Sequence, residues 1–260
     1  MVLIALFSYL PMVGLSIGFQ KFNPTQGLFG SPWVGFDNFT YVFQLKDTMN
    51  VLRNTVLIAV MKILAGLAVP IVVALLLNEA ANKFFKRSVQ TIVYFPHFLS
   101  WVILSGILVD ILSLRDGIVN QVISLFGAEP IFFLGDKNWF PIVLVVSDVW
   151  KEFGFGTIVY LAALTAINPN LYEAAQIDGA GRWKQTWHIT LPGMMPIVIL
   201  MATLSLGNVL NAGFDQVFNL YSPIVYETGD ILDTYVYRLG MVNFQFGVAT
   251  ALGFFKSVVS

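Results

Sequence analysis

The sequence contains no cysteine and only two histidines, His97 and His188. Without cysteine the chain can form neither disulfide bonds nor thiolate metal sites, and two histidines are too few for a histidine-rich metal site. No G-x-x-x-x-G-K-[ST] phosphate-binding loop occurs, so ATP hydrolysis by that route is excluded. No paired metal motif is present either, which disfavours an intramembrane enzyme. We expect no metal and no cofactor in this chain.

Charge is also scarce. Only 11% of the residues are charged and 57% are apolar, whereas a soluble domain carries roughly 25% charged residues. The chain therefore has too little polar side-chain area to cover a water-soluble globule, and we expect it to lie in a membrane. The net charge of −1 provides no basic field, which excludes nucleic acid as an expected partner.

Long apolar runs account for most of the chain. Each is close to the roughly 20 residues that cross a bilayer as a helix, and the alternating pattern of a membrane barrel is missing. The predicted spans are residues 2–19, 55–77, 89–112, 140–167, 191–213 and 244–260. The predicted fold is therefore all-α, a polytopic membrane helical bundle with about six transmembrane helices. We expect one transmembrane domain over residues 1–260, and we expect that both ends are truncated relative to the natural chain, because the first apolar run lacks a lead-in and the last is short.

Of the polar interruptions between two apolar runs, residues 168–192 form the longest that still has a helical pattern. Asn168 suits a helix N-cap, and Pro169 suits the first turn, where its missing N–H is not needed. Gly179 supplies a left-handed exit, and we expect a helix over Pro169–Asp178. A second short helix is predicted over residues 180–190, ended by Pro192. The first helix is roughly 15 Å long, too short to cross a bilayer, so it either plugs into a groove of a soluble partner or lies on the membrane as a connector.

The same segment carries a composite motif. Glu173-Ala174-Ala175, then Gly179 after three residues, then Ile189-x-Leu191-Pro192 resembles the EAA loop of ABC importer permeases. The flanks are similar to permeases that take up oligosaccharides and polysaccharide fragments; they read Trp33-Val34-Gly35-Phe36-Asp37-Asn38-Phe39, Tyr160-Leu161-Ala162-Ala163-Leu164, Ala212-Gly213-Phe214-Asp215-Gln216 and Asp233-Thr234-Tyr235-Val236-Tyr237-Arg238. The resemblance covers nearly the whole chain.

This resemblance implies a type I ABC importer transmembrane domain in the bacterial cytoplasmic (inner) membrane. It implies four kinds of partner: a second permease, most often a different one; two ATPase subunits, which would hold ATP and Mg; an extracytoplasmic solute-binding protein; and an oligosaccharide substrate. In the family the EAA helix contacts the ATPase. The residues that this carries over are Leu171, Glu173, Ala174, Ala175, Asp178 and Gly179, with Glu173 as the contact and Gly179 as the turn.

The most strongly basic cluster, Lys83, Lys86 and Arg87, indicates the orientation of the chain. Basic residues concentrate in cytoplasmic loops, and with six spans this places the 168–192 loop on the same side. The two inner loops hold five Lys and Arg against six in the much longer outer loops, so density favours this orientation.

The fourth predicted span carries three ionisable side chains, Asp148, Lys151 and Glu152, on one helical face with Phe155. Charges inside a span are costly against lipid, so we expect them to face a partner or a wet cavity. Two interpretations remain open: an internal ion pair of Asp148 or Glu152 with Lys151 that only holds helices together, or a polar sugar path with Trp150 or Phe155 as a stacking platform. The resemblance favours the path. Separately, we expect Lys62 of the second span to pair with an acid on another helix.

The fifth span gives a matching face, with Ser205, Asn208 and Ala212 at helical spacing and Asn211 beside them. The asparagines bond either to neighbouring helices or to substrate. We expect Asn208 first, Asn211 second and Ser205 third in the substrate path. The acidic and aromatic segment 214–243 is expected to be mostly a solvated outer cap.

A second class of function also accommodates the intramembrane charges. In an ion-coupled secondary sugar transporter, Asp148, Lys151 and Glu152 would relay a proton or ion. That hypothesis does not explain the EAA motif, and no inverted repeat is visible in the sequence. The importer permease is therefore the leading prediction.

Overall fold

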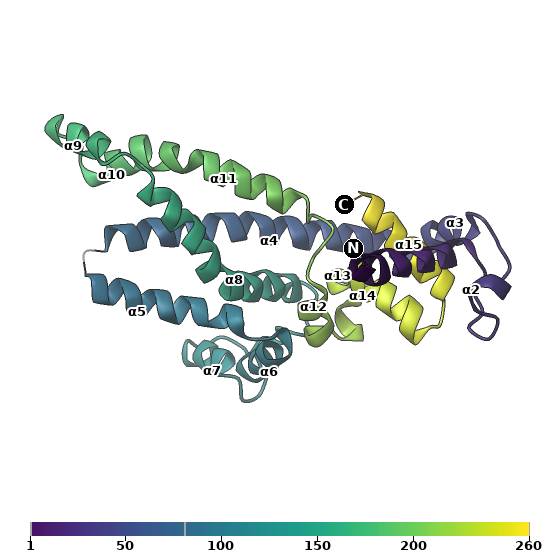
Figure 1. The fold of residues 1–260 in the computed structure, drawn as a ribbon. Coiled ribbons are helices and arrows are strands. Elements are labelled where there is room, and N and C mark those ends of the chain that lie inside the picture. Colours follow the sequence, from purple (N-terminus) through teal and green to yellow (C-terminus); the bar gives the residue numbers. More distant parts are fainter. Residues whose placement is uncertain (1, 81, 260) are drawn as a thin grey trace. The chain divides into compact units, whose positions relative to one another are not determined.

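The computed structural model describes residues 2–80 and 82–259, and in these ranges the chain is built from α-, 3₁₀- and π-helices. The β-structure within the same residues is a single bridge between Gln20 and Trp33. The predicted all-α class is confirmed. The chain divides into two compact units, which are described separately (Figure 1). We call residues 60–108 and 143–209 the loop-bearing unit, and residues 1–59, 109–142 and 210–260 the terminal unit; the single-domain expectation stays a prediction.

The loop-bearing unit contains most of the long helices. Its elements are α4 (Lys46–Glu79, from residue 60), α5 (Lys83–Tyr94), η3 (Phe95–Phe98), α6 (Trp101–Ile111, to residue 108), α8 (Trp139–Thr165, from residue 143), α9 (Pro169–Ile177), α10 (Arg182–Gln185), η4 (Thr186–Thr190) and α11 (Leu191–Leu206). The short helices α9 and α10 lie at the end where α8 and α11 are joined (Figure 1).

Helix α8 packs against its neighbours through small residues. A Cβ at Gly154 would lie 2.0 Å from the Val93 carbonyl oxygen of α5, and a Cβ at Gly156 would lie 3.2 Å from the Pro70 ring of α4. Small residues let helix backbones approach closely where lipid provides no hydrophobic driving force between helices. These two glycines therefore set how closely α8 approaches α5 and α4.

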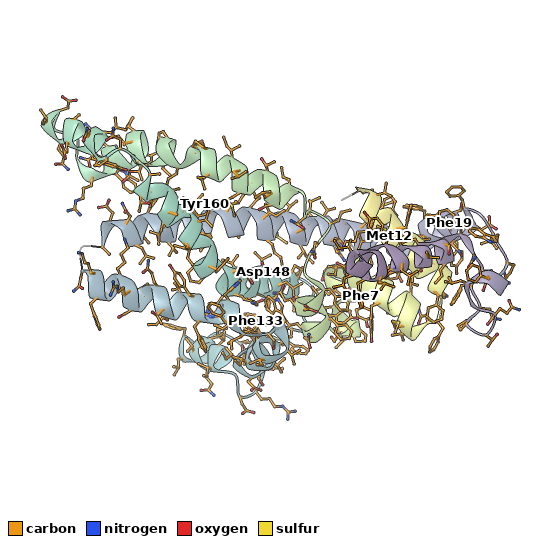
Figure 2. All side chains as sticks on the ribbon, in the orientation of Figure 1. Phe7, Met12, Phe19, Phe133, Asp148 and Tyr160 are labelled. Atoms are coloured by element: carbon orange, nitrogen blue, oxygen red, sulfur yellow. The ribbon has the colours of Figure 1, made fainter. Side chains whose placement is uncertain are left out.

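One end of α8 contributes to the apolar core of this unit. The core contains Ala74 of α4, Tyr160 and Leu164 of α8, and Met194 of α11, all buried. Tyr160 and Asp148 both lie on α8, at different levels along it (Figure 2). The apolar contacts of α8 and its charged residue Asp148 thus lie at different positions along the helix.

The third predicted span is sharply bent. Residues Lys83–Phe98 and Trp101–Ile111 form two helical parts at 106° to each other, separated by Leu99 and Ser100. Pro96 lies in the 3₁₀ turn just before the break, where a residue without an N–H cannot continue the α-helical ladder. The span predicted over residues 89–112 is therefore two helical parts rather than one continuous helix.

Pro192 does not end a helix, contrary to the sequence prediction. The chain continues from Arg182 to Leu206 as a helix long and apolar enough to cross a membrane. Residues Thr186–Thr190 are π-helical, and the Leu191 N–H bonds to the Thr186 carbonyl. A π-turn shifts the bonding pattern by one residue, which accommodates the missing Pro192 N–H inside the helix.

The terminal unit collects both chain ends. Its elements are α1 (Val2–Ile4), η1 (Ala5–Tyr9), η2 (Leu10–Phe19), α2 (Gly27–Gly30), α3 (Asp37–Gln44), the start of α4, the end of α6, α7 (Ile118–Leu125), the start of α8, α12 (Phe214–Leu220), η5 (Pro223–Val225), α13 (Tyr226–Gly229), α14 (Leu232–Tyr237), η6 (Arg238–Val242) and α15 (Phe246–Val259). Helix η2 packs on α15, and a Cβ at Gly18 would lie 3.3 Å from the Ala251 backbone nitrogen. Phe19, labelled in Figure 2, contacts the rings of Phe39 and Phe254.

The segment Gly14–Gly18 has the G-x-S-x-G spacing of a nucleophile elbow, the turn that carries the catalytic serine of some hydrolases. It lies within η2, however, and not between a strand and a helix as that motif requires.

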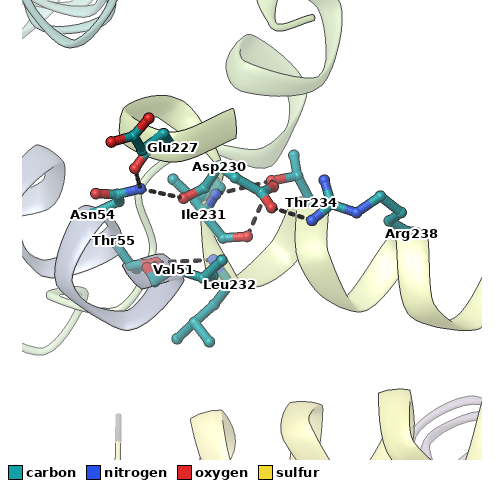
Figure 3. Close-up of polar contacts among 9 residues, drawn as sticks. All are labelled: Val51, Asn54, Thr55, Glu227, Asp230, Ile231, Leu232, Thr234 and Arg238. Atoms are coloured by element: carbon teal, nitrogen blue, oxygen red, sulfur yellow. Dashed lines mark hydrogen bonds and ion pairs between the residues drawn. The ribbon is translucent and has the colours of Figure 1, made fainter. Parts of the chain in front are cut away.

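A buried polar network holds the segment after residue 226 to the start of α4 (Figure 3). The Asp230 carboxylate accepts from the Thr234 hydroxyl at 2.7 Å and from the Arg238 guanidinium at 2.5 Å. Asn54 donates to the Glu227 carbonyl at 2.9 Å, and the Leu232 N–H donates to Thr55 at 2.8 Å. Burial raises the pKa of the Asp230 carboxyl above its usual value, although Thr234 and Arg238 act in the opposite direction.

The solvated outer cap expected over residues 214–243 is therefore wrong in part. Gln216, Asp230 and Tyr235 are all buried. The Asp230 carboxylate offsets the cost of burial through Thr234 and Arg238, partners that composition alone does not reveal.

Only some of the predicted membrane spans are helices that are both long enough and apolar enough to cross a membrane. Among the described residues, Lys46–Glu79 and Arg182–Leu206 meet both criteria, and the bent pair from Lys83 to Ile111 meets them together. Helix α8, with 27 residues, has the length for a span but carries three charged residues near its middle. Leu10–Phe19 and Phe246–Val259 are apolar but shorter. The number of six crossings stays a prediction.

Gly154→Ala tests the packing of α8. The added methyl group would overlap the Val93 carbonyl, so we expect a loss of about 1–3 kcal/mol in stability and a lower midpoint of thermal unfolding in detergent. The matched control is Gly66→Ala, in the interior of α4 with no atom within 4 Å, which should be neutral or stabilising by up to about 1 kcal/mol. Equal midpoints of thermal unfolding for the two variants would contradict the close contact between Gly154 and Val93.

Candidate functional site

The helix predicted in the 168–192 loop is present as α9, Pro169–Ile177, one residue shorter than expected because Asp178 is its C-cap. The Asn168 side chain accepts a hydrogen bond from the Asn170 N–H at 3.0 Å, and Pro169 occupies the first turn. Gly179 has φ +77°, the left-handed conformation predicted for it. These local features confirm the sequence-based account of how α9 begins and ends.

The exit from α9 is fixed by two further backbone bonds. The Gly179 N–H bonds to the Gln176 carbonyl at 3.0 Å, and the Ala180 N–H bonds to the Ala175 carbonyl at 2.8 Å. This pair is the Schellman pattern, which requires a left-handed residue at the Gly179 position. The direction in which the chain leaves α9 is thus set by its own backbone.

Helix α9 is anchored on one side and open on the other. Tyr172 is half-buried, and its hydroxyl lies 3.0 Å from the Thr190 hydroxyl of η4. Glu173 and Ala174 are exposed, and Ile177 is 88% exposed. The side of α9 opposite Tyr172 is therefore uncovered within this chain.

The open surface of the loop carries most of the residues singled out for coupling. Leu171, Glu173, Ala174, Asp178 and Gly179 are exposed, and Ala175 is half-buried. Arg182 of α10 pairs with Glu79 at the end of α4, at 3.3 Å. Their coupling role stays a prediction at this point.

The charges of α8 form two separate groups. Asp148 pairs with Lys62 of α4, with 3.1 Å between Oδ1 and Nζ. The Lys62 side chain is 9% exposed and that of Asp148 is 26% exposed. The expectation that Lys62 pairs with an acid on another helix is confirmed, and this pair joins α4 to α8.

The second group joins α8 to the bend between η3 and α6. The Lys151 Nζ lies 3.2 Å from Glu152 Oε1 and donates to the His97 carbonyl at 2.7 Å. The Glu152 Oε2 lies 2.7 Å from His97 Nδ1. Because an ionised carboxylate only accepts, Nδ1 of His97 carries the hydrogen in this contact. The His97 ring stacks on Phe155 at 4.3 Å and 5°.

Two members of this group were missed from the sequence. The sequence pattern assigns no role to His97 or to Trp101, whose ring centroid lies 5.8 Å from the Lys151 Nζ. The available signal was Pro96 beside His97, because a helix break inside a membrane frees backbone carbonyls that a buried amine can use. Lys151 pairs with Glu152, one of the two pairings predicted for it, and Phe155 stacks on His97 beside them, whereas Asp148 pairs with Lys62 instead.

The predicted face of the fifth span is not formed. Helix α11 ends at Leu206, so Asn208 and Asn211 lie beyond it and do not continue the helical spacing from Ser205. The Ser205 hydroxyl bonds to the Met201 carbonyl at 2.8 Å and the Asn208 amide to the Leu204 carbonyl at 3.3 Å. Their place in a substrate path stays a prediction.

Within residues 2–80 and 82–259, no group of three or more His, Asp or Glu side chains is arranged to hold a metal ion. The expectation that this chain carries no cofactor is not tested by that arrangement and stays a prediction.

Comparison with protein families identifies relatives for nearly the whole chain. The family described as "Binding-protein-dependent transport system inner membrane component" matches residues 66–260. The chain is 42% identical over 254 residues to the polygalacturonan/rhamnogalacturonan transport system permease protein YteP of Bacillus subtilis (strain 168), covering 98% of this chain and 79% of YteP. It is also 42% identical to protein LplB of the same strain, covering 98% and 80%.

A solved structure agrees with the sequence relatives. A chain in the crystal structure of a bacterial ABC transporter involved in the import of the acidic polysaccharide alginate is 41% identical, with a TM-score of 0.91. The match covers 99% of this chain and 87% of that one. A second structure shows a bacterial alginate ABC transporter in complex with alginate pentasaccharide-bound periplasmic protein, with a TM-score of 0.90.

A double-mutant cycle tests the Lys62–Asp148 pair. Lys62→Met leaves Asp148 without this cation in a largely apolar setting, which should cost about 3–5 kcal/mol and lower the unfolding midpoint. Adding Asp148→Leu removes the stranded charge and should restore most of the loss. If the loss in unfolding free energy of the double variant equals the sum of the losses of the two single variants, the two side chains do not interact as described.

Proposed function

The chain belongs to the binding-protein-dependent transport system inner membrane component family, and we propose that it is one permease subunit of an ATP-driven importer of oligosaccharides or polysaccharide fragments. The observation that carries the coupling part of this proposal is α9. It is a capped, anchored helix with an open outer surface, placed at the end of α8 and α11. The chain lacks a phosphate-binding loop, so ATP is hydrolysed by separate subunits.

Coupling proceeds through α9. Two ATPase subunits close on ATP, and one of them receives α9 in a groove. Glu173 contacts the ATPase, with Leu171 and Asp178 beside it, while Ala174 and Ala175 permit close approach and Gly179 fixes the exit. Because Tyr172 bonds to Thr190 and η4 continues into α11, a displacement of α9 reaches a membrane helix directly. ATP thereby shifts a two-state equilibrium between outward-open and inward-open forms.

The remaining partners complete the path. A second permease, of similar build but different sequence, closes the cavity, and an extracytoplasmic binding protein delivers the substrate to the outer face. The whole assembly lies in the cytoplasmic membrane of a bacterium. ATP and Mg belong to the ATPase subunits. In this chain the substrate path includes Asp148, Lys151, Glu152 and Phe155 of α8, together with Ser205, Asn208 and Asn211.

We infer an acidic oligosaccharide as the substrate class. Lys151 of α8 is compensated by Glu152, whose side chain is 46% exposed, so an acidic group of the substrate can replace Glu152 at this cation without leaving its charge unpaired. The relatives named for polygalacturonan, rhamnogalacturonan and alginate transport point to the same class. The ion-relay alternative is not favoured, because ion pairs within the unit already account for the α8 charges.

Glu173→Ala tests the coupling role of α9. In the complete transporter in vesicles, we expect uptake and substrate-stimulated ATPase activity to fall at least about tenfold, the loss of one charge-assisted contact. Gln176→Ala, an exposed change on the same helix, is the matched control and should leave both activities within about twofold. Normal stimulation in Glu173→Ala would remove Glu173 from the ATPase contact.

A further inference from the structure

Glu152 contacts two hydrogen-bond donors at once and is the most accessible charged group of its cluster. One carboxylate oxygen lies 3.2 Å from the Lys151 Nζ and the other 2.7 Å from His97 Nδ1. The Glu152 side chain is 46% exposed, whereas that of Lys151 is 10% exposed. An accessible carboxylate therefore neutralises a cation that has little contact with solvent of its own.

Both donors are held in place without Glu152. The Lys151 Nζ donates to the His97 backbone carbonyl at 2.7 Å, and it lies 5.8 Å from the centre of the Trp101 ring. The His97 ring is fixed by its parallel stacking on Phe155. If Glu152 turned away, the amine and the imidazole would keep their positions, because neither depends on Glu152 alone. The two donors are thus preorganised for one carboxylate.

We propose that Glu152 is an internal placeholder for the carboxylate of a uronate sugar, and that Lys151 and His97 form the subsite that binds this carboxylate during transport. The inference rests on the proposed function, because it places that substrate class at named atoms. When a uronate residue arrives, Glu152 turns aside and the substrate carboxylate takes its two contacts. Phe155, a residue that is 48% exposed, lies beside the subsite and can stack on the apolar face of the sugar ring.

The chemistry of the cluster selects a carboxylate over a neutral sugar. Glu152 itself shows that one carboxylate can bridge the two donors, one oxygen to each. A neutral hydroxyl in its place would leave the Lys151 charge uncompensated in a poorly hydrated setting. Exchanging one carboxylate for another changes little in total charge. Binding is then strong enough to select the substrate and weak enough to release it, as a transport path requires.

The Lys62–Asp148 pair does not fit this role. It is less accessible than Glu152 on both sides, with side chains 9% and 26% exposed, and it joins α4 to α8. A placeholder must be reachable by substrate, and of the charged groups on α8 the Glu152 side chain is the most exposed. We therefore assign the exchange to Glu152 and the helix contact to Lys62 and Asp148.

The test measures binding of a radiolabelled galacturonate trisaccharide to the assembled transporter in detergent by equilibrium dialysis. Glu152→Gln removes the competing charge and should tighten binding about fivefold, whereas Lys151→Met removes the cation and should weaken it at least about tenfold. Glu129→Gln, the same chemical change at an exposed residue of the terminal unit, should leave it unchanged. Binding of the neutral galactose trisaccharide should be unchanged in both Glu152→Gln and Lys151→Met.

Opposite effects of Glu152→Gln and Lys151→Met support the placeholder. Weaker binding in both, or no change in Glu152→Gln, overturns it, because an ion pair that only stabilises helices predicts those results. If Lys151→Met does not assemble, Lys151→Arg replaces it, and the direction of the Glu152→Gln effect decides. Uptake by the wild-type transporter into vesicles distinguishes a failure of the placeholder proposal from a failure of the proposed function. ATP-driven uptake of the trisaccharide without an effect of Glu152→Gln overturns the placeholder alone, and absence of any ATP-driven oligosaccharide uptake overturns the proposed function.

Discussion

The pairing of its charged side chains governs how α8 contacts its neighbours. Three ionisable residues within five positions would prevent a helix from lying in lipid unless each found a partner. Asp148 finds Lys62 on α4, and Glu152 and Lys151 find each other and His97 at the bend before α6. The bend follows from Pro96, and it supplies the carbonyl to which Lys151 donates. The charges of one helix thus determine how two of its neighbours contact it.

The same helix leads directly into the loop. After the polar cluster, α8 joins an apolar core at Tyr160 and Leu164 and ends at Thr165, three residues before the N-cap of α9. Helix α9 is then tied to the start of the next long helix by the Tyr172–Thr190 contact. Helix α9 is therefore connected to α8 through the chain and to η4, which continues into α11, through this contact. The proposed coupling role depends on these short connections.

Local features were predictable from the sequence, and tertiary partners were not. The N-cap at Asn168, Pro169 in the first turn and the left-handed Gly179 follow from backbone chemistry, which short segments encode. The partners of Lys151 and Asp148 depend on which helices lie beside α8, and helical spacing does not give that. The predicted helix ends were wrong for specific reasons. A π-turn carried the chain through Pro192, and the end of α11 at Leu206 left Asn208 and Asn211 off the expected face. Burial of Asp230 likewise required the partners Thr234 and Arg238, which composition cannot identify.

The account depends most on α9 being the point at which a separate ATPase moves this subunit. The most direct measurement places a single cysteine at Ala174, possible without background because the chain has none of its own. In the complete transporter, this cysteine should react with membrane-impermeant reagents only from the cytoplasmic side and should crosslink to an ATPase subunit, with a yield that changes when ATP binds. Reaction from the outer side, or failure to crosslink in every nucleotide state, would contradict the account.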